Sequence, residues 1–178
     1  MSWIQTYTGR AFDLLDPQPD MVVIEDIAHA LSNICRFTGH TRVFYSVADH
    51  SCHVAEILPD ELRLQGLLHD AAEAYIQDIA TPLKWLLPDY KLIEQRVWKA
   101  IAAKFNLPEV LDPQVKSADL CMLMTERRDL LSAPPHPWDP FFEAICPVPW
   151  HIIPISGHHG RHAFLRMYDR CSSNVGAA

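Results

Sequence analysis

The sequence lacks the features that mark several classes of protein. No run of 18 apolar residues occurs and the first residues show no signal-peptide pattern, so neither a membrane span nor secretion is expected. The five cysteines form no C-x-x-C pair, so we expect reduced thiols in a cytoplasmic protein instead of a disulfide framework or a cysteine zinc site. Basic residues are outnumbered, 15 against 22 acidic ones, and the net charge of -7 argues against a nucleic-acid polymer as partner.

Strand-like alternation is also nearly absent, apart from a short run at residues 3–7. A chain of 178 residues with 49% hydrophobic content suits a single domain with its own core. We therefore predict an all-α helical bundle over residues 1–178, with its core at about residues 24–131. Apolar residues three or four positions apart predict helices at about residues 24–34, 47–58, 59–78, 89–105, 113–131 and 160–170.

Proline and capping residues set limits to these helices. Residues 133–154 carry seven of the 14 prolines and predict a long proline-rich loop near the C-terminus. Ser46 with Asp49 three residues later is typical of a helix N-cap. Asp112 followed by Pro113 predicts a second capped helix start.

The predicted helix at residues 59–78 carries a polar face. His69, Asp70, Glu73 and Gln77 fall within one arc of about 100° on an ideal helix. Taken alone, this arc is best interpreted as the solvated side of an amphipathic helix.

Two residues on other helices change that interpretation. His50 and Asp119 each lie inside the apolar stripe of a predicted helix. A single inward His or Asp usually makes a hydrogen bond within the core. Together with His69 and Asp70, however, they supply two imidazoles and two carboxylates. This mixture suits a divalent ion such as Zn, Co, Mn, Fe or Ni, and the ion would offset the cost of inward carboxylates.

The same residues carry a resemblance to a known family. The stretch from Leu67 to Glu73 resembles the signature of HD-domain phosphohydrolases. Three further stretches occur in the same order as in that family: Val47–Ser51, Asp78–Lys84 and Lys116–Asp119. Over about residues 24–131 the chain is similar to the small bacterial 5′-deoxynucleotidases of the YfbR and YfdR types and to the phage dATP triphosphohydrolases.

The resemblance implies a role for each residue of the site. It implies that the metal ligands are the same four residues that face inward: His50, His69, Asp70 and Asp119. Glu73 and Asp78 would then be the catalytic acidic residues, which manage protons near the scissile bond. Arg36 would contact the phosphate, with Phe37 where the YfbR type has a tryptophan, and Lys84 is a weaker candidate for the same contact.

The resemblance also implies an enzyme that uses a divalent metal ion to cleave the 5′-phosphoester of a deoxynucleotide. Hydrolysis of dATP to nucleoside and triphosphate is favoured. Hydrolysis of deoxynucleoside monophosphates, and less so nucleotide sensing without catalysis, are the alternatives. Only 19 residues separate His50 from His69, fewer than in the YfbR type, which leaves the substrate preference open. Self-association into a homo-oligomer is expected.

Two neighbouring features have a simpler interpretation. Arg127 and Arg128 after Glu126 are typical of a solvated helix face, although Glu126 or Arg127 can also lie near the site, one or two turns beyond Asp119. His53 points about 60° away from His50 on an ideal helix, so we expect it at the surface or behind a ligand.

Overall fold

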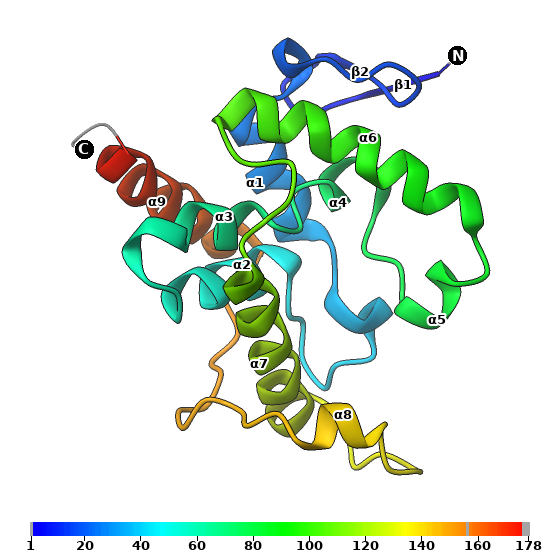
Figure 1. Cartoon of the computed structure of the whole chain (residues 1–178), viewed down its shortest axis with the longest axis vertical. Coiled ribbons are helices and arrows are strands. Elements are labelled where there is room, and N and C mark those ends of the chain that lie inside the picture. Colours follow the sequence, from blue (N-terminus) through cyan, green and yellow to red (C-terminus); the bar gives the residue numbers. More distant parts are fainter. Residues whose placement is uncertain (1, 156, 176–178) are drawn as a thin grey trace.

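Helices carry most of the computed structural model, which describes residues 2–155 and 157–175 (Figure 1). A two-stranded antiparallel hairpin, β1 (Trp3–Gln5) and β2 (Ala11–Asp13), precedes them. The helices follow in chain order: α1 (Ile24–Asn33), α2 (Val47–Glu56), α3 (Arg63–Leu68), α4 (Glu73–Ile76), α5 (Thr81–Lys84), α6 (Pro88–Phe105), α7 (Pro113–Leu130), α8 (Pro140–Glu143) and α9 (Gly157–Val175). The prediction of an all-α bundle is confirmed.

Helix α2 is the central element of the bundle. It contacts α1, α3, α7 and α9, and eight of its ten residues are buried. The predicted N-cap is confirmed, because the Ser46 hydroxyl accepts a hydrogen bond from the backbone N–H of Asp49 at 3.1 Å. With neighbours on so many sides, α2 buries polar residues together with its apolar ones, and His50 is among them.

The prediction of a single helix over residues 59–78 is wrong. The chain forms a 3-10 turn at Asp60–Leu62, then α3, and then tight turns up to the short α4. The backbone N–H of Glu73 bonds the carbonyl of Asp70, three residues back, at 3.0 Å. Such 3-10 bonding turns the chain by about 120° per residue instead of 100°. Gln77 has a φ of 71°, ends α4, and lies exposed away from the predicted polar arc.

A glycine brings α3 close to α2. A Cβ atom at Gly66 would lie 3.3 Å from the Cα of Ala55 and 2.4 Å from a methyl carbon of Leu58. A side chain at this position would therefore force Leu58 to move and would press against the backbone of α2. The close packing carries His69, three residues after Gly66, next to His50, with their ring centroids 5.3 Å apart.

The remaining helices agree largely with those predicted from the sequence. The Asp112 cap of α7 is confirmed, because its carboxylate accepts a hydrogen bond from the backbone N–H of Gln114 at 2.8 Å. The proline-rich segment at 133–154 is mostly irregular, as predicted, but it contains the short α8. The last helix is longer than predicted at both ends. All five cysteines are free. Within residues 2–155 and 157–175, none of the helices combines the length and apolarity needed for a membrane crossing.

Candidate metal centre

Four predicted ligands meet beside the central helix. His50 comes from α2, His69 and Asp70 from the turn between α3 and α4, and Asp119 from α7. The Nε2 atom of His50 lies 3.3 Å from Asp119 Oδ1 and 3.6 Å from Asp70 Oδ2. The Nε2 atom of His69 lies 3.2 Å from the same oxygen of Asp70 and 3.9 Å from that of Asp119. The structure thus brings all four side chains together.

These distances suit one shared cation. Two ligand atoms that each lie about 2.1 Å from one ion are at most about 4.2 Å apart. The four distances between imidazole nitrogen and carboxylate oxygen stay below that limit. Ligand atoms of His50, His69 and Asp119 all lie within 4.8 Å of one another, so this group could hold a metal ion.

Hydrogen bonds turn both imidazoles toward the centre. The Nδ1–H of His69 donates to the backbone carbonyl of Gly66 at 2.7 Å, and the Nδ1–H of His50 donates to the carboxylate of Glu126 at 2.5 Å. In the neutral form of each imidazole, the Nε2 atom therefore presents a lone pair to the centre. Each Nε2 atom is buried and without a hydrogen-bond partner among the described residues. Metal-binding histidines commonly have this arrangement, with the second nitrogen held by a carbonyl or carboxylate.

The charges of the centre favour a cation. Burial opposes ionisation of Asp70 and Asp119, but the neighbouring imidazoles overcome it and hold both pKa values below the ordinary range. Burial and Arg36 lower the pKa of His50, whereas Glu126 and Asp119 raise it, to about 10 on balance. The carboxylates thus attract positive charge to this point, which either a proton on His50 or a divalent ion can supply.

Arg36 reaches the edge of the centre. Its backbone N–H bonds the carbonyl of Tyr45 at 2.9 Å, which fixes it beside the start of α2. Its Nη1 atom lies 3.8 Å from both Asp70 and Asp78. Phe37 follows with a φ of 53°, and the Arg36 guanidinium lies 5.4 Å from the centre of its ring. The structure therefore places the predicted phosphate contact and the predicted second acid, Asp78, next to a predicted ligand.

Glu73 is buried at the start of α4, one turn after His69. Its Oε2 atom has no hydrogen-bond partner among the described residues, and its Oε1 atom lies 3.6 Å from Lys84 Nζ. Burial, followed by the charges of Asp70 and Asp78, raises the pKa of Glu73 well above its ordinary value. Lys84 lies closer to Glu94, at 3.0 Å, so two carboxylates already engage the weaker phosphate candidate.

Glu126 lies beside the four predicted ligands, which is the alternative that the sequence left open, and not on a solvated face. It is 0% exposed and bonds both His50 and Arg36. Its place seven residues after Asp119 on α7 was the signal available in the sequence. Arg127 instead pairs with Glu143 at 2.7 Å, away from the four ligands. His53 contacts Glu56 at 3.2 Å and takes no part in the ligand group.

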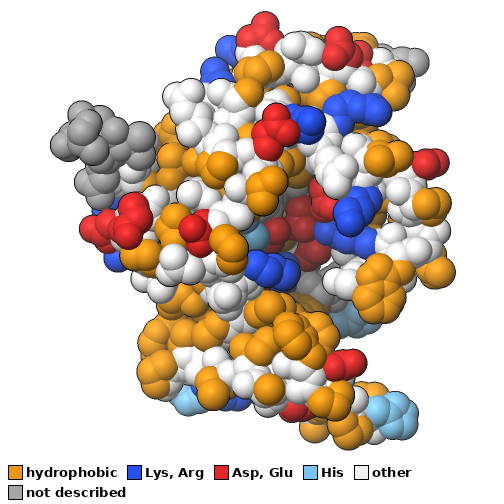
Figure 2. Space-filling view, in the orientation of Figure 1, with side chains coloured by type: hydrophobic (Ala, Val, Ile, Leu, Met, Phe, Trp, Pro, Cys, Tyr) orange, Lys and Arg blue, Asp and Glu red, His pale blue; other side chains and the backbone are white. Residues whose placement is uncertain are grey.

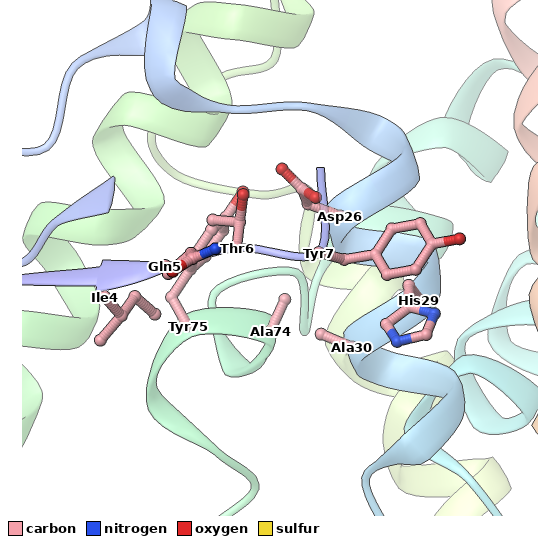
Figure 3. A pocket seen from close by; sticks show the side chains of 9 residues that line it. All are labelled: Ile4, Gln5, Thr6, Tyr7, Asp26, His29, Ala30, Ala74 and Tyr75. Carbon is pink, nitrogen blue, oxygen red and sulfur yellow. The ribbon is translucent and has the colours of Figure 1, made fainter. Parts of the chain in front are cut away.

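A hollow gives access to the centre. Figure 2 shows acidic side chains in a depression near the middle of one face, with Lys and Arg side chains around it. A cavity of about 310 Å³ is lined by His69, Asp70 and Glu73 on one side and by residues of α6, Trp98 included, on the other. Another cavity, of about 270 Å³, lies beneath the N-terminal hairpin (Figure 3), and no predicted site residue lines it.

One known protein resembles this chain over nearly its whole length, and another resembles it over about two thirds. No protein-family model matches it. It is 44% identical over 173 residues to a protein of Escherichia coli K12 named "Uncharacterized protein YfdR", with 97% of each chain aligned. An uncharacterized protein of Rhodobacter capsulatus is 39% identical over 127 residues, which are 66% of this chain and 65% of the relative. Neither name states an activity, so the function has to be argued from the site.

Proposed function

The chain belongs to the family of YfdR, and we propose that it is a divalent-metal-dependent phosphohydrolase of 2′-deoxynucleotides. The favoured reaction is hydrolysis of dATP at the 5′-phosphoester, which releases deoxyadenosine and triphosphate. The favoured ions are Co, Zn and Mn, which accept mixed imidazole and carboxylate ligands. The resemblance of the sequence to HD-domain phosphohydrolases supports the same reaction class.

One observation carries this proposal. Two imidazole nitrogens without hydrogen-bond partners face two carboxylates, with an arginine at the edge of the group. A purely structural cluster would be expected to satisfy these nitrogens within the protein, because buried polar groups nearly always find partners. The combination of a metal site and a guanidinium fits a phosphate ester, which needs charge neutralised on its oxygens.

The chain's own residues divide the work of phosphoester cleavage. When bound, the ion lowers the pKa of a coordinated water and polarises a phosphoryl oxygen. Arg36 binds a second phosphoryl oxygen through Nη1, whose 3.8 Å separations from Asp70 and Asp78 exceed hydrogen-bond length and leave its donors available. Asp78, which lies 3.8 Å from the same Nη1 atom, orients water at the phosphorus.

Glu73 is suited to protonate the leaving group. A raised pKa favours the protonated form of this carboxyl, which can donate its proton to the 5′-oxygen as the ester bond breaks. Its unpartnered Oε2 atom leaves that donor unengaged. The cavity beside Glu73 accommodates the nucleoside, with the half-buried Trp98 in its wall.

A substrate and metal panel tests the proposal. The protein is incubated with deoxynucleoside mono-, di- and triphosphates and with ribonucleoside triphosphates, each with Co, Mn, Zn or Mg, and products are separated by chromatography. Triphosphate from dATP supports the favoured reaction, whereas orthophosphate from monophosphates supports the 5′-deoxynucleotidase alternative. Nucleotide binding without hydrolysis under every condition would refute the enzyme and favour the sensor.

A matched pair of histidines on α2 provides the control. His50→Gln removes one proposed ligand, so we expect loss of both metal binding and hydrolysis. His53→Gln changes the same residue type one turn later, where the side chain contacts Glu56, so it should leave both intact. Equal activity of the two variants would contradict the assignment of His50.

Sedimentation of the same samples tests the expected homo-oligomer.

A further inference from the structure

Glu126 connects the proposed metal site with the proposed phosphate contact. Its carboxylate is fully buried on α7, and its Oε1 atom accepts a hydrogen bond from His50 Nδ1 at 2.5 Å. Its Oε2 atom accepts one from Arg36 Nη2 at 3.2 Å. We propose that Glu126 is a positioning residue that sets the metal-binding tautomer of His50 and, at the same time, the direction of the Arg36 guanidinium.

On the His50 side, the carboxylate decides which nitrogen is free. An ionised carboxylate only accepts hydrogen bonds, so Nδ1 must carry a hydrogen atom. When a metal displaces the second proton of His50, the lone pair is therefore on Nε2, the atom that lies 3.3 Å from Asp119 and 3.6 Å from Asp70. Without Glu126 the imidazole could rotate or place its hydrogen on Nε2, and both changes oppose metal binding.

On the Arg36 side, the carboxylate holds one end of the planar guanidinium. The Nη2 donor is engaged by Glu126, and this fixes Nη1 toward Asp70 and Asp78 at the edge of the metal site. Because the guanidinium is rigid, anchoring one nitrogen directs the other. Without this anchor, Arg36 would be free to pair directly with Asp70 or Asp78, and its donors for a phosphoryl oxygen would be lost.

The two contacts make metal binding and phosphate binding depend on one side chain. A buried ion pair can also have a purely structural role, which here would be to hold α7 against α2. That role would predict a loss of stability without a selective effect on either ligand. Our proposal extends the proposed function, but it concerns binding equilibria, so it can be measured whether or not the protein hydrolyses nucleotides.

Two substitutions separate the two contacts. Glu126→Ala removes both acceptors. Glu126→Gln keeps one amide oxygen, which serves the Nδ1–H of His50 when metal is bound, and places an NH₂ group opposite Arg36, where it cannot accept a hydrogen bond. Asp129→Asn is the control, because Asp129 lies three residues later on α7 and contacts Arg128 and His151 instead of the site.

The measurements are Co²⁺ affinity from its absorption bands, affinity of the Co²⁺-loaded protein for inorganic phosphate by calorimetry, and unfolding by denaturant. We expect Glu126→Ala to lose about 10–100-fold in Co²⁺ affinity. We expect Glu126→Gln to keep most of its Co²⁺ affinity but to bind phosphate at least about tenfold more weakly, since a charge-assisted hydrogen bond is lost. Asp129→Asn should match the unaltered protein in both affinities.

Two results would overturn the proposal. One is Co²⁺ binding by a folded Glu126→Ala variant with unchanged affinity. The other is phosphate binding by Glu126→Gln that is no weaker than binding by Asp129→Asn. If Glu126→Ala does not fold, the phosphate affinity of Glu126→Gln decides alone. A protein that binds Co²⁺ and phosphate as expected but hydrolyses no nucleotide would refute the proposed function and leave the role of Glu126 standing.

Discussion

Replacing Glu73 with Gln should slow hydrolysis and stabilise the fold at the same time. The substitution keeps the shape of the side chain but removes the proton that we assign to the leaving group. General acid catalysis typically contributes about 10²–10⁴-fold, so turnover should fall by that factor. The stability gain follows from the surroundings, because the side chain is 4% exposed and its Oε2 atom has no partner among the described residues.

The pH dependence of stability gives the magnitude and the sign. Burial and the charges of Asp70 and Asp78 raise the pKa of Glu73 well above its ordinary 4.5. The folded protein therefore keeps this proton at pH values where the unfolded chain has released it. Stability then falls as pH rises from about 4.5 toward the folded pKa, and each pH unit in that interval costs about 1.4 kcal/mol. Gln cannot ionise, so the variant lacks this decline.

Denaturant unfolding between pH 4.5 and 8, with chelator present, checks the prediction. The free energy of unfolding of the variant should exceed that of the unaltered protein by an amount that grows with pH. Glu94→Gln is the control, because it removes a carboxylate from the same cavity at a side chain that is 31% exposed and paired with Lys84. A stability difference between Glu73→Gln and the unaltered protein that stays constant with pH would refute the reasoning.

Three further predictions concern the metal, the packing and the cavity. Co²⁺ at 100 times its dissociation constant should raise the free energy of unfolding by about 2.7 kcal/mol, measured by denaturant titration, and His69→Ala should abolish the gain. Gly66→Ala should cost about 1–3 kcal/mol by overpacking against Ala55 and should weaken Co²⁺ binding, because it moves α3 away from α2. Trp98→Ala should raise the KM for nucleotides by about tenfold, as loss of base stacking predicts, and leave the KM for deoxyribose 5-phosphates unchanged in steady-state assays.

Periodicity predicted that His50 and Asp119 face inward, because burial in a helix bundle depends on position along the chain. His50 and Asp119 stand among apolar residues at helical spacing, so any packing that buries those stripes carries both side chains inward. That they point to the same place depends on how α2 and α7 meet, which no spacing within one helix specifies. The residue types led us to predict this meeting, since a bound metal ion would explain why two imidazoles and two carboxylates face inward.

Other features depend on tertiary packing, and the sequence alone did not determine them. Glu126 lies on the same face of α7 as Asp119, but a glutamate at that spacing is more often solvated than buried. Its burial depends on partners 76 and 90 residues away, His50 and Arg36. The break in the predicted helix at 59–78 has a similar cause, because apolar spacing does not distinguish α-helical from 3-10 turns over so few residues. The change from α-helical to 3-10 turns nevertheless places Glu73 in the site and directs Gln77 out of it.

The balance of charge within the site bears on how an acidic hollow would bind the proposed anionic substrate. Asp70, Asp78 and Glu126 lie around Arg36, and Asp119 pairs with Lys116 at 2.6 Å and lies 3.3 Å from His50. In the metal-free protein the raised pKa of His50 favours a proton on that side chain, and a divalent ion at the proposed site would replace this proton and bring a further positive charge. We therefore expect metal to strengthen nucleotide binding and nucleotide to strengthen metal binding, because the two affinities are linked. On this proposal, the inward carboxylates make phosphate binding depend on the metal.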